Sequence, residues 1–118
     1  MKRFLILLLA ISGPLTALCV ADESGGKVTV TGEVLDMACY LDHGAHGEKH
    51  AACAAQCIRS GLPVGIKSAA DGTVYLLIGE HEPLNQKLAD YAAKTITVTG
   101  KLVERDGIKL IENVEIKG

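Results

Sequence analysis

Two Asp-Gly pairs, Asp71–Gly72 and Asp106–Gly107, constrain the fold of this chain more than any other feature. Asp-Gly favours tight hairpin turns because these two residues tolerate the positive φ angles that such turns need. Each pair stands between segments in which apolar and polar side chains alternate, as they do on a half-buried strand. We therefore predict two β-hairpins, one around each pair.

Five strands and two helices follow from the same kinds of pattern. We expect strands at 27–41, 62–70, 73–81, 94–105 and 108–116. Segment 47–61 is rich in alanine and lies between two glycines, which favours a helix. Segment 82–93 has Pro83 near its start and apolar residues at helical spacing. The predicted fold class is therefore mostly β with two short helices.

The order of these elements resembles the oligonucleotide/oligosaccharide-binding (OB) barrel, which has five strands and here a helix between the third and fourth. The stretch "VTGKLVERDGIKLIENVEI" is similar to the last two strands of small exported bacterial OB-fold domains. The resemblance implies a five-stranded OB-like barrel with the 47–61 helix inserted between the first and second strands. A β-sandwich or an open sheet with two helices is the alternative. The resemblance implies no activity, so function must be argued from individual residues.

Residues 1–21 have the pattern of a secretory signal peptide. Lys2 and Arg3 precede an apolar run that is shorter than the roughly 20 residues needed to span a bilayer. The run is followed by "CVA", whose small residues predict cleavage after Ala21. We expect one OB-like domain over 22–118, a periplasmic or secreted location, and membrane contact only through the signal peptide.

Two alternatives to a cleaved signal peptide stay open. The segment could remain as an uncleaved amphipathic anchor, or Cys19 could carry a lipid. The residue before Cys19 is Leu18, whereas a lipidated cysteine usually follows a small residue, so the second alternative is disfavoured.

The predicted mature chain is poorly suited to nucleic acid. Lys2 and Arg3 are two of the twelve basic residues, so 22–118 carries ten Lys and Arg against fourteen Asp and Glu, a net charge of −4 with His neutral. No basic stripe is available to follow a phosphate backbone, and tyrosine is the only aromatic residue type left for base stacking. We expect a metal ion, a small ligand or a protein as the partner.

The stretch "CYLDHGAHGEKHAACAAQC", residues 39–57, holds three of the four cysteines and three of the four histidines. Residues three and four apart lie on the same face of a helix. The side chains with nitrogen or sulfur donors that this spacing aligns are His46, His50, Cys53 and Cys57. Cys39, at the expected end of the first strand, can bring one more sulfur against that face.

Thiolates and imidazole together suit Zn²⁺ or Cu(I). The predicted ligands are Cys39, His50, Cys53 and Cys57, with His46 as a replacement for His50. The spacing matches neither a common zinc-finger motif nor the C-x-x-C-H of covalent haem attachment. The main hypothesis is a small protein that binds a transition metal and does not act as an enzyme.

Two alternatives to metal binding stay open for this cluster. Cysteines of exported proteins tend to pair, and a disulfide from Cys39 to Cys53 or Cys57 would fasten the helix to a barrel that binds a protein or a small ligand. Cys39–Cys57 is the preferred pair, because Cys57 lies deeper in the helix. Thiol redox chemistry is the second, although C-x₃-C is not the C-x-x-C of thioredoxin-like enzymes. The three cysteines after the signal are an odd number, so at least one stays outside any internal disulfide.

Two smaller groups of residues also have functional potential. Asp36 and Asp42 flank Cys39 and could form an acid–base pair, but we expect a strand-end residue and a turn residue. His81 lies between two glutamates and is a second, weaker candidate for a metal ligand. A solvated loop accounts for His81 equally well.

Overall fold

The computed structural model describes residues 25–117, and the structural statements below refer to this part of the chain. The expected signal peptide, its cleavage site and Cys19 lie outside the described residues, so these features and the 1–21 and 22–118 division stay predictions. Within 25–117, no helix has both the length and the apolar character needed to cross a membrane.

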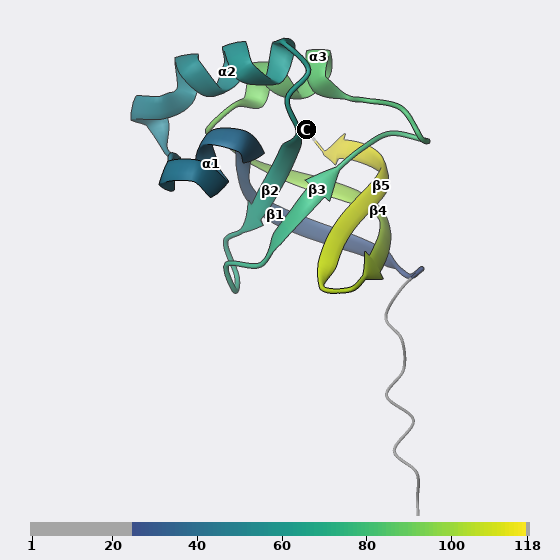
Figure 1. Cartoon of the computed structure of the whole chain (residues 1–118). Coiled ribbons are helices and arrows are strands. Elements are labelled where there is room, and N and C mark those ends of the chain that lie inside the picture. The colour runs from purple at the N-terminus through teal and green to yellow at the C-terminus, as the bar shows by residue number, and fades with distance from the viewer. Residues whose placement is uncertain (1–24, 118) are drawn as a thin grey trace, which may run out of the picture.

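Five strands close into a barrel (Figure 1). They are β1 (Lys27–Asp36), β2 (Val64–Ser68), β3 (Val74–Leu77), β4 (Thr95–Arg105) and β5 (Ile108–Lys117). The strands are hydrogen-bonded in the order β1-β2-β3-β5-β4, and β4 pairs with β1 to close the barrel. All pairs are antiparallel except β3 with β5. The predicted five-stranded OB-like barrel is confirmed.

Both predicted Asp-Gly turns join neighbouring strands. Asp106 and Gly107 have φ angles of 52° and 84°. They form a two-residue connection, because Arg105 pairs with Ile108 on either side of them. Positive φ at both residues is what a type I′ turn requires, which explains why Asp-Gly occurs here. Gly72, in the β2–β3 turn, also has a positive φ of 75°.

Short helices cover one end of the barrel, as Figure 1 shows. They are α1 (Met37–His43), α2 (Ala51–Arg59) and α3 (Asn85–Leu88), with 3₁₀ turns η1 (Glu48–His50) and η2 (Ala89–Tyr91). The helix predicted at 47–61 corresponds to η1 and α2, which lie between β1 and β2. The helix predicted at 82–93 corresponds to α3 and η2, and both of these pack against α2.

The prediction that the first strand continues to residue 41 is wrong. β1 ends at Asp36, and the next seven residues form α1. Asp36 caps this helix, because its Oδ1 accepts the N–H of Ala38 at 3.0 Å. Gly44, with a φ of 67°, ends the helix in the left-handed conformation. Cys39 therefore lies on a helix and not at the end of a strand.

The hydrophobic core holds α2 in place over the barrel. Ile58 of α2 is fully buried, together with barrel residues such as Ile66 and Ile111. The side-chain amide of Asn85 on α3 donates to the carbonyl oxygens of Ile58 at 2.8 Å and Leu62 at 2.7 Å. These contacts fix the position and rotation of α2, and thus the direction in which its cysteines point.

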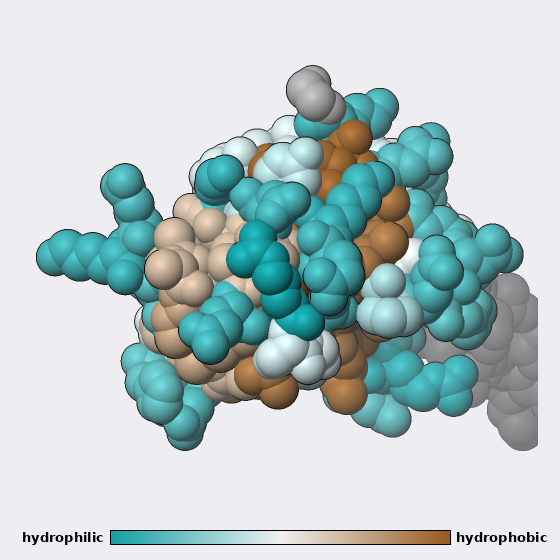
Figure 2. All heavy atoms as spheres, turned by 90° about the horizontal axis from the view of Figure 1, so that it is seen from above, coloured by the Kyte–Doolittle hydropathy of each residue, from teal (hydrophilic) through white to brown (hydrophobic). Residues whose placement is uncertain are grey.

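The outward face of α2 carries small apolar residues, whereas its inward face carries a large one. Seen from above, pale apolar atoms gather among hydrophilic side chains (Figure 2). On α2 the exposed or half-exposed apolar positions include the small residues Ala51, Ala52 and Ala55, while the large Ile58 is buried. Small apolar side chains thus lie on the outer face of α2, and its only large apolar side chain, Ile58, faces the core.

Gly32 offers a test of the barrel packing. A Cβ added at Gly32 in β1 would lie 2.0 Å from the backbone oxygen of Lys67 in β2, and backbone cannot move aside easily. We expect Gly32→Ala to lower the free energy of unfolding by about 1–3 kcal/mol, measured by urea denaturation. Gly79→Ala is the matched control, because its Cβ would first meet the Glu82 side chain, which can rotate away. An equal loss in both variants would contradict the packing described here.

Candidate metal centre

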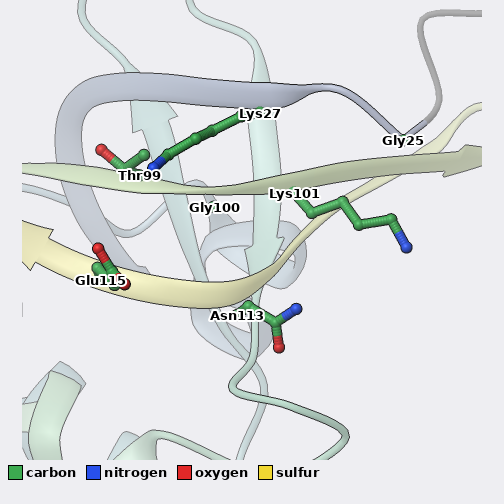
Figure 3. A pocket seen from close by; sticks show the side chains of 7 residues that line it. All are labelled: Gly25, Lys27, Thr99, Gly100, Lys101, Asn113 and Glu115. Atoms are coloured by element: carbon green, nitrogen blue, oxygen red, sulfur yellow. The ribbon is translucent and has the colours of Figure 1, made fainter.

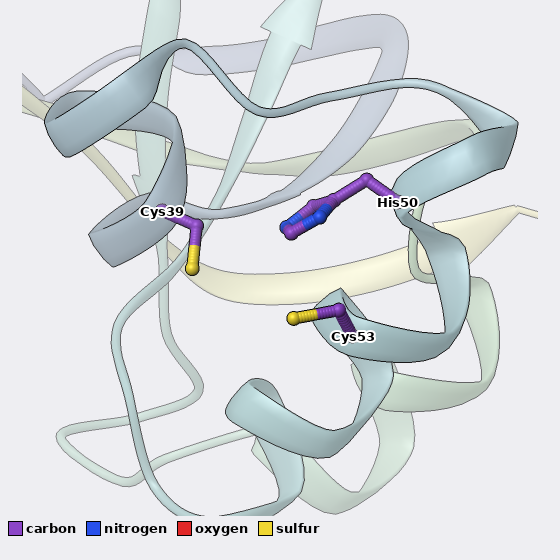
Figure 4. Close-up of side chains that lie close together, drawn as sticks. All are labelled: Cys39, His50 and Cys53. Carbon is purple, nitrogen blue, oxygen red and sulfur yellow. The ribbon is translucent and has the colours of Figure 1, made fainter.

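Side chains from α1, from the 3₁₀ turn η1 and from α2 converge on one space. The Cys39 sulfur, the His50 ring and the Cys53 sulfur point toward one another (Figure 4). One donor atom from each of the three lies within 4.8 Å of the other two. A Zn²⁺ ion lies about 2.3 Å from a sulfur ligand, so two sulfurs on one ion are at most about 4.6 Å apart. Small side-chain rotations therefore suffice for all three to reach one ion.

A second group of donors adjoins the first and shares Cys39 with it. It consists of Asp36, Cys39 and Cys57, whose donor atoms again lie within 4.8 Å of one another. Asp36 is 1% exposed, Cys39 and Cys57 are half-buried, and Cys53 is exposed. The five donors thus extend from the buried end of β1 to the surface of α2.

Two buried polar atoms in this region make no hydrogen bond. They are Asp36 Oδ2 and His50 Nε2, which lie 3.9 Å apart. Leaving a buried polar atom without a partner typically costs about 1–3 kcal/mol. Such atoms in a folded protein need a partner, which an ordered water or a bound ion can supply. A cation held by these side chains would supply that partner.

The thiols next to Asp36 are poor acids. Hydrogen bonding with the Asp36 carboxylate, loss of hydration and repulsion by the carboxylate charge raise the pKa of Cys39 to about 12. Loss of hydration, followed by the charge of Asp36, raises the pKa of Cys57 as well. Both residues are therefore thiols at neutral pH in the metal-free protein. A redox-active cysteine needs the opposite shift, so this environment disfavours thiol redox chemistry at Cys39 and Cys57.

The structure brings together four of the five predicted ligands: Cys39, His50, Cys53 and Cys57. His46 belongs to neither group. It precedes η1, so it does not continue the α2 face, and its side chain is 53% exposed with Nδ1 3.6 Å from a Glu33 carboxylate oxygen. Its ring also stands edge-on to Tyr40, with the ring centres 6.4 Å apart.

The other histidines of the described chain also lie outside the two groups. His43 ends α1, is exposed, and has its Nδ1 3.0 Å from Asp42. His81 is an exposed residue of the connection between β3 and α3. Asp42 is likewise exposed, so the structure does not pair it with the buried Asp36.

Asp36 is the residue of the site that sequence reasoning did not select. It lies at the end of a strand, as expected, but its side chain also caps α1 and faces the cysteines. The sequence carried one usable signal, an aspartate followed eight residues later by Gly44, which is typical of a short capped helix. Placing a helix there would have turned Asp36 and Cys39 toward each other.

Two cavities lie elsewhere on the barrel. A polar one of about 300 Å³ lies where β4 is irregular around Gly100 (Figure 3). Lys27, the first residue of β1, lines it, so it lies at the opposite end of that strand from Asp36. A mostly apolar cavity of about 370 Å³ is bounded by β3, β5 and the start of α3. Neither cavity is lined by a cysteine.

Comparison with known proteins adds no assignment, because no family model, no curated protein and no solved structure matches this chain. The resemblance to small exported bacterial OB-fold domains therefore stays a prediction. What can be said of the site rests on its own geometry, which shows a Cys/His/Asp group that could hold a metal ion.

The raised pKa values lead to a test by alkylation. In the metal-free protein we expect Cys39 and Cys57 to react slowly with iodoacetamide at pH 7 and faster as the pH rises, since only the thiolate is nucleophilic. Asp36→Asn removes the negative charge and should speed the reaction of both. Peptide mass spectrometry measures the rate at each cysteine. Asp42→Asn, at an exposed carboxylate on the same helix, is the control and should change little.

Proposed function

We propose that this chain is a small exported protein, periplasmic or secreted, that binds a thiophilic transition metal ion. The observation that carries the proposal is the convergence of Cys39, His50 and Cys53 from α1, η1 and α2 within 4.8 Å. Two sulfurs and one imidazole form a donor set that suits Zn²⁺ or Cu(I). Cys57, one helical turn beyond Cys53 and close to Cys39, supplies a third sulfur.

The position of the site supports reversible binding. The exposed Cys53 forms its outer edge, so an ion can reach the donors without unfolding of the barrel. An open edge on a rigid scaffold therefore favours storage or delivery of the ion over a structural role alone.

Metal titration of the reduced, metal-free protein tests the proposal. We expect stoichiometric uptake of Zn²⁺ or Cu(I), each measured in competition with a coloured chelator. Cys53→Ser should weaken binding more than about 100-fold, since even residues that only support a ligand contribute about 10–100-fold. His43→Gln removes an exposed histidine outside both donor groups and should bind as the wild type does. If the wild type takes up neither ion, the proposal is wrong.

The protonated thiols predict a steep pH dependence. The pKa of Cys39 is raised to about 12, so the metal must displace its proton at any neutral pH. Each displaced proton makes the apparent affinity fall about tenfold for each unit that the pH decreases. Displacement of the protons of Cys39 and Cys57, whose pKa values are both raised, predicts a fall of about 100-fold between pH 8 and pH 7. A chelator competition series over this range measures the slope, and a flat profile would exclude thiolate ligation.

A disulfide-stapled binding module is the second candidate. It is favoured by the mostly apolar cavity of about 370 Å³, a size that suits a small ligand. The structure shows the three cysteines as free thiols, so the predicted Cys39–Cys57 bond stays a prediction. Thiol counting on unreduced protein separates the candidates: one free thiol favours the staple, and three favour the metal site.

A further inference from the structure

We infer that the metal centre has two adjacent ion positions that share the Cys39 sulfur. The outer position is formed by Cys39, His50 and Cys53, and the inner position by Asp36, Cys39 and Cys57. This inference rests on the proposed metal binding and extends it to the number and the class of the ions: two Zn²⁺ ions bridged by one thiolate.

The arrangement of the three sulfurs supports two positions. Cys53 and Cys57 are four residues apart on α2, and side chains at this spacing start about 5–6 Å from each other. Cys39 faces both of them from α1 and is the one residue common to the two donor groups. An ion that contacts the Cys53 side of Cys39 therefore leaves its Cys57 side open. A thiolate has three lone pairs and can bind one ion on each side.

Asp36 supplies the second argument. It is 1% exposed, its Oδ1 already caps α1, and its Oδ2 has no hydrogen-bond partner. A carboxylate oxygen of this buried residue lies within 4.8 Å of the Cys39 and Cys57 sulfurs, and its Oδ2 is unpartnered, an arrangement that a bound cation would satisfy. Nothing in the folding of α1 requires Oδ2, because the cap uses the other oxygen.

Charge balance is compatible with two ions. Three thiolates and the Asp36 carboxylate carry four negative charges when all of them bind metal, and two Zn²⁺ ions neutralise all four. With one ion, a sulfur that does not bind it keeps its proton. The carboxylate also selects the class of ion, because oxygen ligands are common for Zn²⁺ while Cu(I) prefers sulfur.

A single ion with Asp36 in a supporting role is the competing arrangement. Asp36 Oδ2 lies 3.9 Å from His50 Nε2, so a slight shift would let the histidine donate to the carboxylate while its other nitrogen binds the metal. The two arrangements predict different numbers of bound ions in the wild type. They also predict different effects of Asp36→Asn on that number.

Zinc counting on the reduced full-length exported protein decides between them. Native mass spectrometry gives the number of Zn²⁺ ions, and competition with a coloured chelator gives each affinity. We expect two ions for the wild type and one for both Asp36→Asn and Cys57→Ser, which remove different inner ligands. Cys39→Ser should lose both ions, and His43→Gln should keep two. Circular dichroism of each variant establishes that it is folded. If Asp36→Asn does not fold, the ion count of Cys57→Ser alone tests the inner position.

The results of this experiment separate the inference from the proposal on which it rests. The two-position arrangement is wrong if the wild type binds one ion and Asp36→Asn also binds one, only more weakly. Metal binding itself would then still hold. If the wild type binds no ion, both the two-position arrangement and the proposed metal binding are wrong. With two ions bound, the cadmium-substituted protein should give two cadmium NMR signals that are coupled through the shared sulfur, and uncoupled signals would exclude the bridge.

Discussion

The Asp36 carboxylate does two things at once, and the rest of the site depends on both. Its Oδ1 accepts the Ala38 N–H and so ends β1 and starts α1. Without that turn, the chain would continue as a strand, and Cys39 would not face α2. Its other oxygen, Oδ2, has no hydrogen-bond partner, and the carboxylate lies close to the Cys39 and Cys57 sulfurs. The carboxylate that starts α1 is therefore also the one with an unpartnered oxygen near the cysteines.

The apolar core of the barrel supplies stability that offsets the cost of the unpartnered atoms. Ile58, Leu88 and Ile111 are completely buried and join α2 and α3 to the sheet, so the position of α2 does not depend on the metal donors themselves. The unpartnered atoms of Asp36 and His50 reduce the stability of the metal-free protein, while the apolar core supplies stability away from them. Binding of a cation would return the lost free energy, because a ligand that binds only the folded state stabilises it.

The sequence was sufficient for the barrel but only partly for the site. Asp106–Gly107 fixes a hairpin because few other residue pairs accept its φ angles. β4 and β5 are long enough to be recognised as strands although their alternation is interrupted near Gly100 and Asn113. The helix α1 has only seven residues, too few for a helical period to stand out against the alternation before it. Because α1 was missed, the role of Asp36 was missed with it. The exclusion of His46 from the donor groups could not be predicted either, since it depends on η1 and the loop before it.

The raised thiol pKa values connect the site to the oxidising compartment in which we place the protein. Disulfide formation requires attack by a thiolate, and the neighbouring carboxylate keeps Cys39 and Cys57 protonated at neutral pH. This environment therefore slows the reaction that would lead to a disulfide. A Zn²⁺ ion does not meet the same obstacle, because its positive charge offsets the repulsion between carboxylate and thiolate. The same carboxylate therefore disfavours pairing of the sulfurs and favours their binding of a cation.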